Sequence, residues 1–167
     1  MKSFVLGFVA AIVLPLAVVV GALRLGAFEV RADVHAPAWQ KSLFDFAVRA
    51  AVRRLAPRVQ SPVPHTDAEL IAGGHLYLNA CAGCHGNPGG RPQNLTEYLP
   101  SPEFAQVGTA YSEPELFWII EHGIRRTGMS AYATSFKERE VWSLAEFVKR
   151  MHDLPPPVLD ALRPKKH

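Results

Sequence analysis

The chain opens with one long apolar stretch. Phe4 to Leu23, FVLGFVAAIVLPLAVVVGAL, contains twenty residues without a charge. As a helix that rises 1.5 Å per residue, this stretch would span roughly 30 Å, which is the thickness of the hydrocarbon core of a bilayer. Pro15 would kink the helix, and membrane spans tolerate such kinks. The pattern predicts a signal anchor within residues 1–30. A cleaved leader with Val20-Gly21-Ala22 as its cleavage site is the alternative.

A second apolar pattern follows between residues 36 and 55. Trp39, Leu43 and Phe46 recur at helical spacing, with basic residues between them. This predicts a basic amphipathic helix, which three prolines then separate from the rest, so that residues 31–64 form a helix and an extended linker. Two interpretations stay open: the helix lies on an anionic lipid surface, or it packs on a partner subunit or on the domain that follows.

Residues 65–154 carry helix signals and no convincing strand alternation. One helix candidate covers Asp67 to Cys84, with Thr66 or Asp67 as its cap. Two capping boxes of the form S-x-x-E predict two further helix starts. They are Ser112 with Glu115, before a helix that stops at Gly123, and Ser135 with Glu138, before a helix that the run Leu154-Pro155-Pro156-Pro157 ends. We therefore predict an all-α domain over residues 65–154 and a C-terminal tail over residues 155–167.

Two long loops, 86–111 and 123–134, separate these helices. Loops of this length are unusual in so small a helical domain, which indicates that something other than side chains fills its middle. Charge is also divided unevenly along the chain: residues 36–64 sum to +4 and residues 65–154 to −4. The main domain therefore lacks the basic patch that nucleic-acid binding requires.

The two cysteines of the chain lie in CAGCH, as Cys81 and Cys84, and His85 follows directly. A structural zinc site needs a second ligand pair that the chain does not offer. A thioredoxin-like dithiol needs a βαβ unit, and a disulfide across three residues closes a short loop that contributes little stability. None of these explains the histidine. C-x-x-C-H is the attachment signature of c-type haem, in which two thiols add to the vinyl groups and the histidine binds the iron. A covalent haem would also fill the missing core.

Around this motif, residues 66–154 resemble the class I monohaem c-type cytochromes, including the membrane-tethered domains associated with haem-copper oxidases. The resemblance implies about three to four helices wrapped round one covalently attached haem c. It also implies that the first of these helices crosses the last. Gly73 and Tyr77 look like the contact residues on the first helix, and Leu144 and Phe147 like those on the last.

The family's sixth ligand is a methionine in a loop of the type G-x-x-x-T-G-M-P. In this chain GIRRTGMSAY places Met129 forty-four residues after His85, with Ser130 in place of the proline. Met151 is expected in the core, and His122 is the substitute ligand if Met129 is not used. Pro92 resembles the proline whose carbonyl accepts a hydrogen bond from the haem-ligating histidine. Further candidates for contacts with the ring or its propionates are Tyr111, Trp118, Arg125, Arg126 and Tyr132.

Histidine and methionine would occupy both axial positions, which leaves one-electron transfer as the chemistry of the site. We therefore expect an electron-transfer protein rather than an enzyme, with redox proteins and the membrane as partners and no small-molecule substrate. The expected location is the bacterial inner membrane, with the haem domain in the periplasm. The protein would act as a carrier or as the cytochrome subunit of a respiratory complex. The alternative is a gas-binding or sensing haem with a weak or absent sixth ligand.

Overall fold

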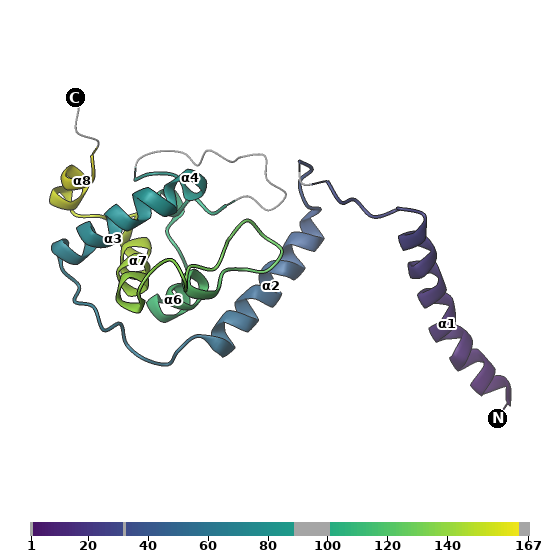
Figure 1. Cartoon of the computed structure of the whole chain (residues 1–167). Helices are drawn as coiled ribbons and strands as arrows, with labels where there is room; N and C mark the ends of the chain where they lie inside the picture. Colours follow the sequence, from purple (N-terminus) through teal and green to yellow (C-terminus); the bar gives the residue numbers. More distant parts are fainter. Residues whose placement is uncertain (1, 32, 89–100, 164–167) are drawn as a thin grey trace. The chain divides into compact units, whose positions relative to one another are not determined.

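The computed structural model describes residues 2–31, 33–88 and 101–163. The chain divides into two compact units, residues 1–32 and residues 33–167. The described residues form eight α-helices and no strand, which confirms the all-α prediction (Figure 1).

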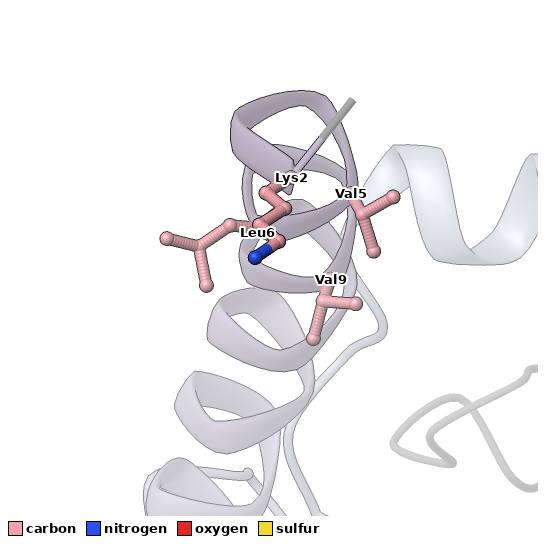
Figure 2. A pocket seen from close by; sticks show the side chains of 4 residues that line it. All are labelled: Lys2, Val5, Leu6 and Val9. Carbon is pink, nitrogen blue, oxygen red and sulfur yellow. The ribbon is translucent and has the colours of Figure 1, made fainter.

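The first unit is a single helix, α1 (Lys2–Arg24), with Pro15 inside it. Its apolar side chains are exposed, and Phe4–Arg24 is long and apolar enough to cross a membrane. Length and composition alone do not separate an anchor from a signal sequence. Figure 2 shows Lys2, Val5, Leu6 and Val9 around a shallow hollow that belongs to α1 alone.

The second unit begins with α2 (Ala38–Leu55), the expected amphipathic helix. Its Val52 is buried, and the Arg49 guanidinium lies 5.9 Å from the centre of the Tyr111 ring in the following domain. The opposite apolar side chains, Trp39, Leu43 and Phe46, remain 61–71% exposed. The helix thus packs on its own domain by one face and leaves a second apolar face open.

The core lies where α3 (Asp67–Ala80) crosses α7 (Glu138–Arg150) (Figure 1). Gly73 permits the close approach, because a Cβ atom built there would lie 2.2 Å from the carbonyl oxygen of Ser143. The rings of Tyr77 and Phe147 pack with their centroids 5.3 Å apart, and Leu144 is fully buried beside them. The four contact residues expected from the family resemblance therefore do meet at this crossing.

A polar contact supports the same crossing. Glu69, 8% exposed on α3, accepts hydrogen bonds from the Ser143 hydroxyl and, at 2.8 Å, from the Arg139 guanidinium. Burying a carboxylate is costly unless such donors satisfy it, so this pair also fixes the register of α3 against α7.

The third large helix, α6 (Glu113–His122), completes the core. Its Phe117 stacks on Trp142 of α7 with the ring centroids 4.2 Å apart. The predicted capping box is confirmed, since the Ser112 backbone N–H donates to Glu115 Oε2 at 2.8 Å. Gly123 ends the helix as expected.

Three boundaries differ from the sequence prediction. The helix expected through Cys84 ends at Ala80, and a separate turn, α4 (Ala82–His85), follows. The predicted box at Ser135 and Glu138 is wrong: Lys137 is the cap, and its backbone N–H donates to the Glu140 carboxylate at 2.7 Å.

The third difference lies at the C-terminal end. α7 stops at Arg150, before the proline run that was expected to end it, and α8 (Pro156–Leu162) forms within the predicted tail. Proline is favourable in the first turn of a helix, which explains a start at this place. Val158 and Leu162 of α8 are buried in the core.

Candidate functional site

The CAGCH segment lies where α3 ends and α4 begins. Cys81 leaves the regular helix at φ −117° and ψ −31°, and the His85 backbone N–H donates to the Cys81 carbonyl at 3.0 Å. Gly86, at φ +75°, then ends the turn. Cys81 is half-buried and Cys84 is exposed, and the two are not joined by a disulfide. Burial, and secondarily the nearby Cys84 thiol, raises the pKa of Cys81 to about 11.

His85 is held from two directions by the segment that precedes and includes α5 (Phe104–Val107). Its ring stacks on Phe104, with centroids 4.9 Å apart and planes 23° from parallel. Its Nδ1 lies 3.2 Å from the carbonyl oxygen of Pro102. When Nδ1 carries the proton and donates it there, Nε2 is the nitrogen whose lone pair is suited to a metal.

Pro92, the expected carbonyl partner of His85, lies outside the described residues. Among the described residues, Pro102 supplies such a carbonyl, and Pro102 was not among the residues predicted from the sequence. The sequence holds a weak signal for it, since Pro100 and Pro102 precede the short apolar run Phe104-Ala105. Nothing in that pattern indicates which proline carbonyl faces the imidazole.

Met129 lies in the loop between α6 and α7 and is half-buried against the core. Its carbonyl accepts a hydrogen bond from the Ile124 backbone N–H at 3.0 Å, and its own N–H donates to the Thr127 hydroxyl at 3.0 Å. Gly123 turns the chain at φ +67°, where a Cβ atom would lie 2.7 Å from the Met129 carbonyl oxygen. The loop is therefore closed on itself, with Met129 at a defined place.

Tyr132 joins this loop to the CAGCH segment. Its hydroxyl donates to the carbonyl of Ala80, the residue before Cys81, at 3.2 Å. Burial raises the Tyr132 pKa, and the nearby thiols of Cys81 and Cys84 raise it further. Residues fifty-two positions apart in the sequence thus meet at one place, and Met129 lies three residues from this contact.

The remaining candidates lie in other surroundings. Tyr111 faces α2 and the Arg49 guanidinium, and its backbone carbonyl accepts a hydrogen bond from Lys149 at 2.8 Å. Trp118 is half-buried, with its ring 5.0 Å from that of His122, and Arg125 is exposed in the Met129 loop. Arg126, beside it, adopts the left-handed φ of +65°. Their contact with a cofactor stays a prediction.

The donor set fits covalently attached haem. The segment supplies two thiols and an imidazole whose second nitrogen faces a carbonyl, and the neighbouring loop supplies a thioether. Thiols and imidazole at this spacing are the attachment groups of haem c, and a histidine and a methionine are an established axial pair for haem iron.

Comparison with known proteins agrees with the interpretation of this site as a haem c site. Residues 68–148, just under half of the chain, match the family model described as cytochrome c oxidase, cbb3-type, subunit III. No curated protein and no solved structure gives a significant match. The matched region contains the CAGCH segment, the Met129 loop and the crossing of α3 with α7. The family implies haem c and electron transfer rather than catalysis. A long apolar helix lies at the N-terminal end of the sequence. Residues 68–148 thus form a cytochrome c domain of the cbb3-type oxidase subunit III family.

Proposed function

We propose that this protein is a one-electron carrier, anchored in the bacterial inner membrane by α1 with its cytochrome domain in the periplasm. The observation that carries the proposal is the hydrogen bond from Tyr132 to the Ala80 carbonyl. It brings the loop that holds Met129 to the segment that holds Cys81 and His85. An imidazole and a thioether from two distant parts of the chain are then available to one iron.

Each residue has a distinct task. The thiols of Cys81 and Cys84 would hold the ring by thioether bonds, and His85 Nε2 and the Met129 sulfur would bind the iron. Haem c supplies a one-electron iron couple that the thioether ligand shifts toward the reduced state. The Pro102 carbonyl orients the imidazole and increases its basicity. With His85 and Met129 both bound, no place would remain for a small-molecule substrate on the iron.

The anchor acts on the rate of encounter rather than on the chemistry. A domain tethered to the membrane meets membrane-bound partners at an effective concentration that the linker sets. The partners are a membrane-bound donor or acceptor complex, and the protein serves either as a free carrier or as a subunit of such a respiratory complex. A net charge of −4 over residues 65–154 favours docking on a basic surface.

The test is a pair of methionine variants of the haem-loaded protein. The oxidised wild type should show the weak far-red absorption band of methionine-to-iron ligation, and Met129→Ala should lose it. Met151 is the matched control, because it is 3% exposed in the core at the end of α7. Met151→Leu conserves volume and should keep the band.

Two outcomes would count against the proposal. A wild type without the band, whose reduced form binds carbon monoxide rapidly, would favour the alternative of a gas-binding or sensing haem. The replacement of the usual proline by Ser130 is the sequence feature on which that alternative rests. Retention of the band in Met129→Ala would assign the sixth ligand to another residue, with His122 tested next.

A further inference from the structure

Three side chains from separate segments converge away from the CAGCH segment. His65 lies at the end of the proline-rich linker, Glu113 is the first residue of α6, and Glu146 lies within α7. One potential ligand atom from each lies within 4.8 Å of the other two. His65 Nδ1 is 2.9 Å from Glu146 Oε2 and 3.9 Å from Glu113 Oε1.

Glu146 is the unusual member of this cluster. It has no exposed surface, and neither of its carboxyl oxygens makes an aligned hydrogen bond within the described part of the chain. His65 Nδ1 lies 2.9 Å from Glu146 Oε2, close enough for the two groups to interact as charges. An ionised carboxylate is rarely buried unless a cation or several donors compensate it. Glu69, the buried carboxylate on α3, has a guanidinium and a hydroxyl as donors, whereas Glu146 has the His65 imidazole nearby and no aligned donor among the described residues.

The second carboxylate increases the demand for positive charge. Burial raises the pKa of Glu113, and the adjacent Glu146 raises it further. Glu146 likewise raises the pKa of His65. A proton on His65 would neutralise one of the two carboxylates, whereas a divalent cation bound by neutral imidazole would neutralise both.

We propose that His65, Glu113 and Glu146 bind a divalent cation of the zinc class through one imidazole nitrogen and two carboxylate oxygens. Tetrahedral zinc with bonds of about 2.1 Å places its ligand atoms about 3.4 Å apart. The distances of 2.9 and 3.9 Å lie on either side of that value, and the ligand oxygens of Glu113 and Glu146 lie within 4.8 Å of each other. Mixed imidazole and carboxylate donors suit zinc better than the oxygen-preferring calcium or magnesium.

The surroundings of the cluster suit an ion that enters from solvent. The His65 side chain is 57% exposed and that of Glu113 is 20% exposed, so water can reach the site and occupy a fourth position. The Ser61 hydroxyl lies beside the Glu113 carboxylate, and its interaction with that group lowers the Glu113 pKa against the larger effects that raise it. The bound ion would fasten the end of the linker to α6 and α7. This role is independent of the proposed electron transfer.

The experiment measures zinc binding to the full-length, haem-loaded protein without an affinity tag, after a chelator has removed metal. Equilibrium dialysis followed by metal analysis should find one zinc ion bound per chain. Its binding should depend on the side chains of His65 and Glu113. His65→Ala and Glu113→Gln should each weaken binding roughly tenfold or more, since each removes a direct ligand. His75→Ala is the matched control, because His75 is exposed on α3 away from the cluster, and it should bind as the wild type does.

Thermal unfolding gives a second readout that does not depend on redox activity. Zinc at about 100 times its Kd should raise the Tm of the wild type and of His75→Ala by roughly 10 °C, and should leave His65→Ala nearly unchanged. The proposal is overturned if the wild type binds no zinc, which would mean that the cluster holds only a proton. Equal binding by His65→Ala and the wild type, or loss of binding in His75→Ala, would place the ion elsewhere and overturn it as well.

Discussion

The close approach of α3 to α7 gives a sharp prediction for Gly73→Ala. The added Cβ would lie 2.2 Å from the Ser143 carbonyl oxygen, 2.8 Å from its carbonyl carbon and 3.0 Å from Phe147 Cβ. Ordinary contact begins near 3.4 Å, so the two helices would have to separate by roughly 1 Å. Backbone atoms cannot rotate away, and the separation would loosen the fully buried Tyr77 and Leu144.

The expected magnitude follows from two opposing effects. Overpacking and the voids that follow it destabilise the fold by about 3–4 kcal/mol, whereas the higher helix propensity of alanine stabilises it by about 1 kcal/mol relative to glycine. Gly73→Ala should therefore lower the free energy of unfolding by about 2–3 kcal/mol, which corresponds to a Tm lower by roughly 10–20 °C.

Gly74→Ala is the control, one residue further along α3. Its Cβ would lie 2.6 and 2.8 Å from the two Cδ atoms of Leu162, at the end of α8, and 3.0 Å from Phe147 Cε2, so every close contact is with a side chain and none with the backbone. Side-chain atoms can shift where backbone atoms cannot, so we expect a smaller loss than for Gly73→Ala, about 1 kcal/mol. The assay is urea and thermal unfolding of the haem-loaded proteins, followed by far-UV circular dichroism. Equal stability of Gly73→Ala and the wild type, or equal destabilisation by the two substitutions, would refute the packing argument.

Two further predictions concern the electron-transfer site. Gly123→Ala should weaken the far-red methionine band while α6 and α7 stay folded. The reason is that φ +67° disfavours alanine by about 1–2 kcal/mol, and the added Cβ would lie 2.7 Å from the Met129 carbonyl oxygen. An unchanged band in the oxidised spectrum would contradict this prediction. Reduction by a membrane-bound partner should slow as ionic strength rises, since the domain carries −4, and stopped-flow rates that do not vary with salt would exclude charge steering.

Sequence patterns predicted the start of a helix correctly where the capping interaction joins residues close in the sequence. Ser112 and Glu115 satisfy each other within four residues, so the start of α6 could be read directly from the sequence. The start of α7 could not, because Ser135 and Glu138 match the same pattern while the chain instead places Lys137 at the cap. That choice depends on the turn that begins at Tyr132, whose carbonyl accepts the N–H groups of Ser135 and Phe136.

The candidate site likewise combines features that local sequence patterns predict with features that depend on tertiary folding. The spacing of Cys81, Cys84 and His85 predicts them as attachment groups for haem c, because thioether and imidazole chemistry needs those residues at that spacing. The partner of the imidazole could not be predicted, since Pro102 reaches His85 only through the path of the loop. Likewise, no pattern links Tyr132 to Ala80, fifty-two residues earlier, because tertiary folding alone creates that contact.

The attachment of the Met129 loop to the rest of the domain has a consequence for ligand exchange. Bringing together two groups forty-four residues apart costs about 3 kcal/mol of chain entropy. The hydrogen bond of Tyr132 with Ala80 and the packing of Met129 and Tyr132 on the core offset part of that cost before any iron is bound. Rupture of the proposed iron–sulfur bond would therefore leave the Met129 sulfur nearby in a folded loop. Dissociation and recapture of this ligand would then be a rapid, reversible local event, separate from denaturation of the domain.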